Sequence, residues 1–111
     1  AANTLEYFIH HEDVRLAVGR SPLDLPAELE HELWKIVSRM SKLMMRRSPV
    51  GIELICGDRS VTPKTAERSV RVSGEVGELA LFTYGRQAHA VVEVDGSPTD
   101  VDAAMSASFG I

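Results

Sequence analysis

The clearest pattern in the sequence is an apolar repeat over residues 29–44. Apolar side chains recur there at spacings of three and four, which predicts an amphipathic helix from Pro26 to about Arg47. Acidic residues crowd its first turns and basic residues its last turns, as the helix macrodipole favours. We expect Trp34 and the methionines of this helix to fill the core, and His31 to be solvated among the acids. The repeat consists of Leu29, Leu33, Ile36, Val37, Met40, Leu43 and Met44.

A second helical pattern precedes this one. It runs from about Thr4 to Val18, and Gly19 then offers a left-handed stop. Residues 21–26 contain two prolines, which bar a helix and predict a short linker. The sequence also opens directly on a helix-start pattern and not on Met, so we expect it to be the carboxy-terminal piece of a longer protein.

Three segments alternate between apolar and polar residues and predict strands. They are residues 50–56, 69–74 and 90–95. Residues 57–60 are expected to form a turn, and the polar residues 62–68 a loop. Cys56 falls on the apolar face of the first strand, which favours a buried and inert thiol.

Two more helices are predicted in the carboxy-terminal half. The apolar run 78–84 fits a strand or a helix, and we assign a short helix because glycines bracket it and Leu79 and Phe82 pair at i, i+3. A last helix is expected over Asp100–Ser108, with Thr99 as its cap. The order of elements predicts an α+β fold with a small, mainly antiparallel sheet covered by helices.

Composition and charge narrow the classes of function. The chain has 111 residues, enough for one small core, and its net charge is -4. Arg46-Arg47 is the only adjacent basic pair, so we expect no nucleic-acid partner. No apolar run approaches the roughly 20 residues that span a bilayer, so we expect no membrane partner either. A lone cysteine, Cys56, suits a reducing cytoplasm.

The densest group of candidate metal ligands lies in the first helix. Glu6, His10 and Asp13 are spaced i, i+4 and i+7, so they share one face, whereas His11 points roughly 100° away from His10. Glu6 and His10 supply two ligands, while catalytic zinc usually takes three protein ligands and structural zinc four. Asp13 would orient an imidazole or simply pair with a nearby arginine. The alternative is an ordinary helix start, in which Asn3 and Glu6 form a capping box.

Residues 5–15, LEYFIHHEDVR, resemble the last bundle helix of the DinB-like metal-binding proteins. The most similar group is the mycothiol-dependent maleylpyruvate isomerases and their actinobacterial relatives. In that family a Glu-x-x-x-His pair joins a His from an earlier helix to hold a divalent metal, usually taken as zinc. Glu6 and His10 match the pair. The rest of the chain resembles the family's sterol-carrier-like carboxy-terminal domain, most clearly at residues 77–86, GELALFTYGR.

The resemblance implies two parts: residues 1–20 as the last helix of a metal-binding bundle, and residues 21–111 as the α+β domain. The parent protein would be a metal- and mycothiol-dependent isomerase or transferase, with Arg86 meeting an anionic substrate or cofactor. The earlier bundle helices, which would carry the third ligand, are the expected partner, so the chain is expected to be inactive alone. Phe8 and Ile9, detached from the bundle, favour self-association through the first helix.

Other interpretations stay open. The domain could be a carrier for a small apolar ligand, for which an apolar cavity of several hundred Å3 would speak. It could also be a structural or dimerisation domain, with a filled core and a large apolar interface. Arg86 could make only a surface salt bridge, and nothing in the spacing recruits His31 or His89 to the Glu6–His10 pair.

Overall fold

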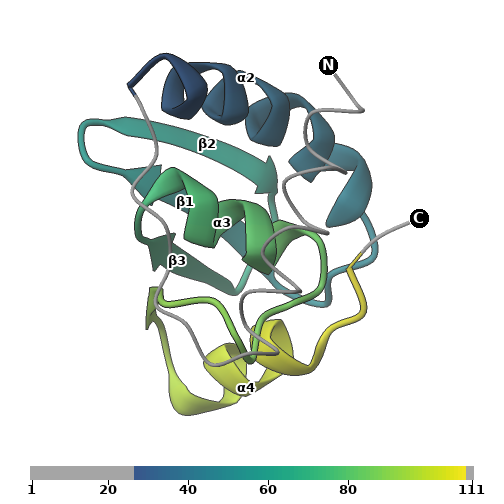
Figure 1. Ribbon diagram of the computed structural model, residues 1–111. Helices are drawn as coiled ribbons and strands as arrows, with labels where there is room; N and C mark the ends of the chain where they lie inside the picture. Colours follow the sequence, from purple (N-terminus) through teal and green to yellow (C-terminus); the bar gives the residue numbers. More distant parts are fainter. Residues whose placement is uncertain (1–26, 110–111) are drawn as a thin grey trace.

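The computed structural model describes residues 27–109, where it shows an α+β fold with three helices and a four-stranded mixed sheet (Figure 1). The first predicted helix, the linker, the division at residue 20 and self-association through that helix lie outside the described residues. The elements in chain order are α2 (Ala27–Met44), β1 (Gly51–Cys56), β2 (Arg59–Lys64), β3 (Ser69–Ser73), α3 (Val76–Thr83), β4 (Glu93–Asp95) and α4 (Pro98–Ser106).

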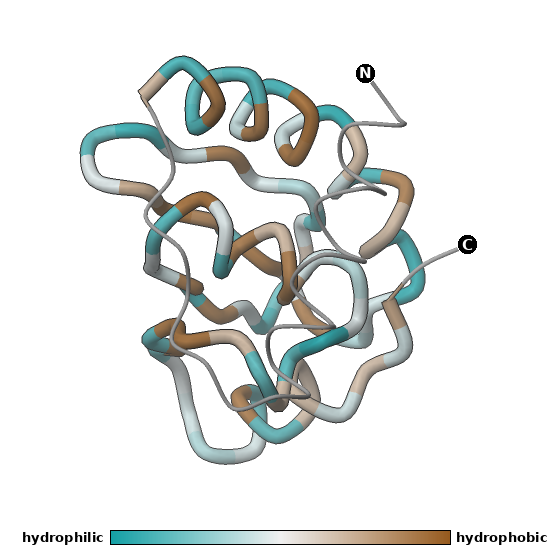
Figure 2. Tube along the Cα trace, in the orientation of Figure 1, coloured by the Kyte–Doolittle hydropathy of each residue, from teal (hydrophilic) through white to brown (hydrophobic). Residues whose placement is uncertain are grey.

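The predicted amphipathic helix is confirmed as α2. Its apolar face is buried, with Leu33 and Val37 fully inaccessible to solvent. Apolar and polar residues alternate along its coil in Figure 2, as an apolar stripe of helical period requires. Leu29 and Leu43 lie at the edge of that stripe and keep 37% and 42% of their surface exposed. Trp34 packs against the core and His31 is exposed, as predicted.

The sheet has the strand order β2-β1-β3-β4. β1 pairs antiparallel with β2, and β3 antiparallel with β4, as predicted for a mainly antiparallel sheet. The central pairing, between β1 and β3, is parallel. The chain reaches this arrangement by folding β2 back along one side of β1 and then placing β3 on the other side.

The prediction for residues 59–64 was wrong, because they form strand β2 and not a turn and loop. Gly57, with φ of 64°, and Asp58 make a two-residue hairpin turn, so that Cys56 faces Arg59 across the ladder. Polar residues and Pro63 hid the strand. Both are compatible with an edge strand, and Pro63 lies where the pairing register shifts, at a bulge that tolerates a missing N–H group.

The carboxy-terminal elements differ from the prediction mainly at their ends. β4 covers only Glu93–Asp95 of the predicted strand 90–95. α4 begins two residues earlier than predicted, and its cap is Ser97 instead of Thr99. The Ser97 hydroxyl accepts a 3.2 Å hydrogen bond from the Asp100 N–H, and proline follows at the first helical position.

The core lies between one face of the sheet and the helices α2 and α3 (Figure 1). Alternation along the strands turns four side chains toward it: Ile52, Leu54, Val70 and Val72. α3, the short helix predicted from residues 78–84, is buried at all of its residues, as expected of a helix that is apolar nearly all round. Phe82 extends the core toward the carboxy terminus, where its ring lies 5.5 Å from that of Phe109.

Candidate functional site

The predicted metal ligands Glu6 and His10, together with Asp13 and His11, lie outside the described residues. Within residues 27–109, no group of three or more His, Cys, Asp or Glu side chains is placed to hold a metal ion. His31 and His89 are both exposed. The metal site at Glu6 and His10 therefore stays a prediction.

Arg86 lies in the turn that closes α3. Gly85 adopts a left-handed φ of 87°, its N–H donates to the Phe82 carbonyl at 3.2 Å, and the Arg86 N–H donates to the Leu81 carbonyl at 2.9 Å. These two bonds form a Schellman motif, which satisfies carbonyls that a helix end leaves without partners. The Arg86 Nη1 donates to the Tyr84 carbonyl at 2.7 Å. The half-buried cation is thus held at the carboxy-terminal end of α3, where the helix dipole favours positive charge.

The neighbouring residue, Gln87, ties this turn to the end of the chain. Its side chain is buried, and Nε2 donates to the carbonyls of Ala107 at 2.7 Å and Ala104 at 3.5 Å. A Cβ at Gly85 would meet the Phe109 carbonyl oxygen at 3.1 Å, so the tail packs closely on the turn. The position of Arg86 therefore depends on both α3 and the tail after α4.

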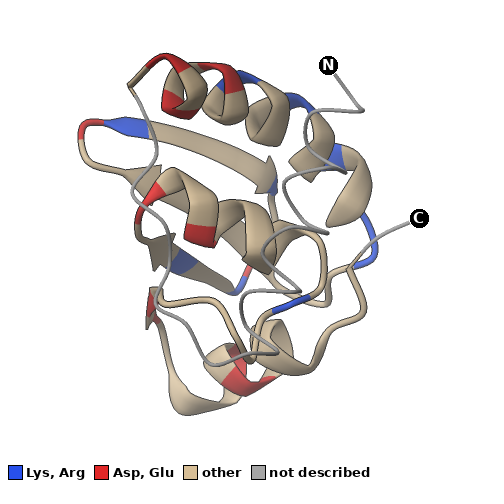
Figure 3. Cartoon of the chain, in the orientation of Figure 1, with Lys and Arg blue, Asp and Glu red and all other residues tan. Residues whose placement is uncertain are grey.

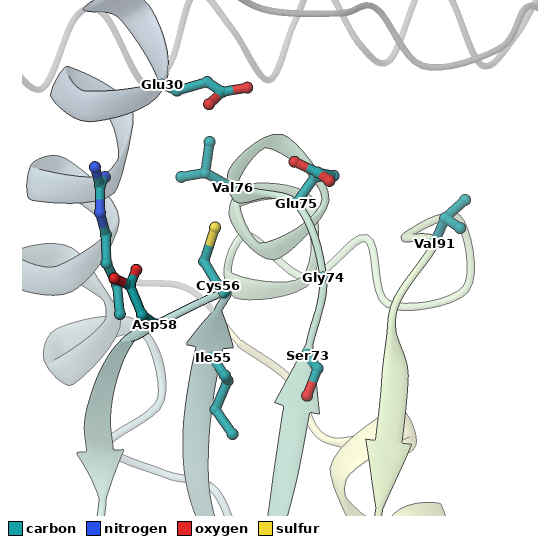
Figure 4. Close-up of a pocket in the computed structure, with 11 residues that line it drawn as sticks. Glu30, Ile55, Cys56, Asp58, Ser73, Gly74, Glu75, Val76 and Val91 are labelled. Carbon is teal, nitrogen blue, oxygen red and sulfur yellow. The ribbon is translucent and has the colours of Figure 1, made fainter. Parts of the chain in front are cut away.

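A pocket of about 580 Å3 opens at the other end of α3 (Figure 4). It lies beyond the carboxyl ends of the parallel strands β1 and β3, a location where open sheets with parallel strands bind ligands. The hairpin turn after β1 and the start of α3 form much of its wall. The lining residues are Glu30, Ile55, Cys56, Gly57, Asp58, Arg59, Ser73, Gly74, Glu75, Val76 and Val91.

The sequence predicts a buried thiol at Cys56. The structure places Cys56 only half-buried, in the wall of this pocket. Burial raises the pKa of its thiol, and the carboxylates of Glu75 and Glu30 raise it further, against the opposing effects of Arg59 and the Val76 backbone N–H. The thiol is therefore protonated at neutral pH and is a poor nucleophile and metal ligand. This agrees with the predicted inert character.

The pocket and Arg86 do not form one site. Val76, the first residue of α3, lines the pocket, whereas Arg86 lies three residues beyond Thr83, the last residue of the same helix. The two ends of this eight-residue helix are about 12 Å apart at 1.5 Å per residue. Sequence patterns could not reveal the pocket, because it depends on the parallel pairing of β1 with β3. The only local hint was the thiol at the end of an alternating strand.

Comparisons with known proteins do not identify this chain: no family model, curated protein or solved structure matches it. Among the residues with a described structure, no helix is both long and apolar enough to cross a membrane. The resemblance to the DinB-like proteins thus rests on the sequence motifs alone.

Proposed function

We propose that this chain is the carboxy-terminal part of a metal-binding, mycothiol-dependent isomerase or transferase of the DinB-like family, acting in the cytoplasm. In this proposal the described α+β fold is the sterol-carrier-like domain. Glu6 and His10 supply two metal ligands, and a helical bundle encoded before them supplies the third. The observation that supports the proposal best is the placement of Arg86, a half-buried cation held by backbone bonds at the end of a buried helix.

Arg86 suits the role of an anchor for a carboxylate. Its guanidinium is planar and always charged, and a fixed fork of N–H donors can hold a carboxylate through two parallel bonds. The Schellman turn sets the backbone of Arg86, and the Gln87 side chain braces that turn. A divalent metal, when bound, would hold a thiol cofactor as its thiolate. Arg86 would orient the anionic end of the cofactor or of the substrate.

The alternative of a carrier for apolar ligands has less support. The pocket beside Cys56 has the volume of a ligand site, but four of its eleven lining residues are charged, which does not suit an apolar ligand. The core between sheet and helices is filled, as the full burial of Leu79 and Phe82 illustrates. A structural or dimerisation domain would need a broad apolar interface. Across residues 27–109 the exposed large apolar side chains are only Leu29, Leu43 and Val91.

The test of the metal site uses the longer protein that includes the preceding bundle helices. We expect it to bind stoichiometric zinc by calorimetry, and His10→Ala to abolish that binding. His31→Ala serves as the control, because His31 is exposed on α2. Retention of stoichiometric zinc by His10→Ala would contradict the proposed ligand set.

The test of Arg86 uses the zinc-loaded longer protein titrated with mycothiol or with a dicarboxylic substrate analogue. Arg86→Gln should weaken binding of one of them by about 10- to 100-fold, the usual worth of a charged hydrogen bond. Arg86→Lys should bind little better than Arg86→Gln, because lysine lacks the planar fork of donors that holds a carboxylate. The control, Arg59→Gln, removes one positive charge away from Arg86 and should leave the affinity for both ligands unchanged. Equal affinities for wild type and Arg86→Gln would remove Arg86 from the site.

A further inference from the structure

The structure gathers cations that are scattered in the sequence. Lys35, Arg39, Lys42 and Arg46 follow one another at i, i+4, i+7 and i+11, so they lie along one side of α2 and its last turn. All four side chains are exposed. Figure 3 shows this segregation along α2, with acidic residues at the start of the helix and basic residues over the rest.

A second element adds to this group at the end of α2. Lys64, the last residue of β2, donates a 2.8 Å hydrogen bond from Nζ to the Arg46 carbonyl, although 18 residues separate the two in sequence. Arg47 follows directly and is exposed. Together these residues form a basic patch made of Arg39, Lys42, Arg46, Arg47 and Lys64.

The charges of the basic patch are not neutralised within residues 27–109. None of its five members makes an ion pair with another described residue; Lys35, just outside the patch, lies 3.9 Å from Glu32. Glu32, the acid of α2 nearest to the patch in sequence, precedes Arg39 by seven residues, about 10.5 Å along the helix, which exceeds the ~8 Å screening length at physiological salt. Glu67, on the loop after β2, is the acid nearest to Lys64 in sequence.

The shape and the side chains of the patch narrow the kind of partner. Leu43 lies among its cations and is 42% exposed. Four of its members lie exposed on the outer side of α2 and on its closing turn, and the fifth, Lys64, also lines a pocket of about 220 Å3 beside β2. Cations around one protruding leucine fit a flat and deformable anionic surface.

We propose that the basic patch at the end of α2 docks reversibly on the surface of an anionic lipid bilayer. The cations approach the lipid phosphates and carboxylates, and Leu43 enters the headgroup region. The acidic start of α2 lies more than one screening length from the basic patch, so the net charge of -4 does not prevent the patch from facing the lipid. The docking is peripheral and needs no membrane-spanning segment, so it departs from the expectation of no membrane partner, which rested on the lack of such a segment in the sequence. It does not depend on the metal or thiol chemistry proposed above.

The test measures co-sedimentation of the full chain with vesicles that contain phosphatidylserine, against vesicles of pure phosphatidylcholine. Binding should require phosphatidylserine and fall steeply as salt rises. Lys42→Gln with Arg47→Gln should weaken it by about fivefold for each cation removed, hence about 25-fold. The matched control, Arg59→Gln with Arg71→Gln, makes the same charge change elsewhere and should alter binding less than about twofold.

Three results would overturn the proposal. The first is no binding to phosphatidylserine vesicles at low salt, and the second is an equal loss in the two double variants. The third is tighter binding to a single-stranded oligothymidylate than to the vesicles in the same buffer, which would assign the patch to nucleic acid. Far-ultraviolet circular dichroism confirms that each variant is folded before its binding is compared. Leu43→Ser, which leaves the charge unchanged, should also weaken vesicle binding; unaltered binding would overturn the insertion of Leu43.

Discussion

The carboxy-terminal end of α4 depends on one side chain from another part of the chain. α4 ends at Ser106, and its cap residue Ala107 is extended; neither a glycine there nor a basic residue in the last turn satisfies the final carbonyls. Gln87 fulfils that role, because its Nε2 donates to the carbonyls of Ala107 and Ala104 from a buried position. We predict that Gln87→Met, which keeps the volume and removes the amide, lowers the free energy of unfolding by about 2 kcal/mol.

The magnitude follows from the two bonds. The 2.7 Å bond to Ala107 is strong, whereas the 3.5 Å bond to Ala104 lies at the limit of a hydrogen bond. A typical hydrogen bond contributes about 1 kcal/mol, and a buried carbonyl left without a partner costs about 1–3 kcal/mol. Ala104 is fully buried, so water cannot replace the amide at its carbonyl without local opening. A loss of about 2 kcal/mol corresponds to a fall of about 8 °C in Tm for a chain of this length.

The assay is urea unfolding followed by Trp34 fluorescence and by circular dichroism, with the free energy taken from the midpoint at an unchanged slope. The control is Ser106→Ala, which removes an exposed hydroxyl that bonds the Asp102 carbonyl at the same helix end. It should cost less than about 0.5 kcal/mol. A loss below about 0.5 kcal/mol for Gln87→Met, or one equal to that of the control, would refute the role assigned to Gln87.

Three further predictions concern a thiol, a turn and an ion pair. Because the pKa of Cys56 is raised, its alkylation by iodoacetamide should be slower than that of a free thiol at pH 8 and accelerate in Glu75→Gln; an unchanged rate would exclude the carboxylate effect. Gly85→Ala should lower the free energy of unfolding in urea by about 1–3 kcal/mol, because φ is positive and the added Cβ meets a carbonyl oxygen. Gly57 also has a positive φ, but a Cβ there meets open space, so Gly57→Ala should cost less. Asp100→Asn weakens the 2.9 Å ion pair with Arg68, whose side chain is 61% exposed. The free energy of unfolding should fall by about 1 kcal/mol or less, and the fall should shrink at high salt.

The sign of the pH effect on stability follows from the direction of the Cys56 shift. Its pKa is higher in the folded protein than in the unfolded chain, so the folded state holds its proton more tightly. The resulting stabilisation is complete at pH values below the unfolded pKa and is lost as pH rises through the folded pKa. A Cys56→Ser variant should therefore show less alkaline destabilisation than the wild type in thermal melts above pH 8. An identical alkaline profile would contradict the assigned shift.

The local period of the sequence determined the helices α2 and α3 and the alternating strand β1. Each buries one set of side chains at fixed spacing, or is apolar throughout, so a short window contains the information needed to predict it. Arg86 could be singled out by resemblance, but the Schellman turn and the brace from Gln87 could not. The ligands Glu6 and His10 were predicted from helical spacing and resemblance, and they remain predictions.

The tertiary structure alone decided the features that join distant segments. A polar segment with a proline becomes strand β2 only because β1 offers it an edge, and the parallel pairing of β1 with β3 creates the pocket beside Cys56. Gln87 caps a helix from 17 residues away, and Lys64 joins the cations of α2 across 18 residues. Local propensity and period act within one turn or one strand. Pairing and capping depend on which segments the folded chain brings together, and no short window of sequence contains that information.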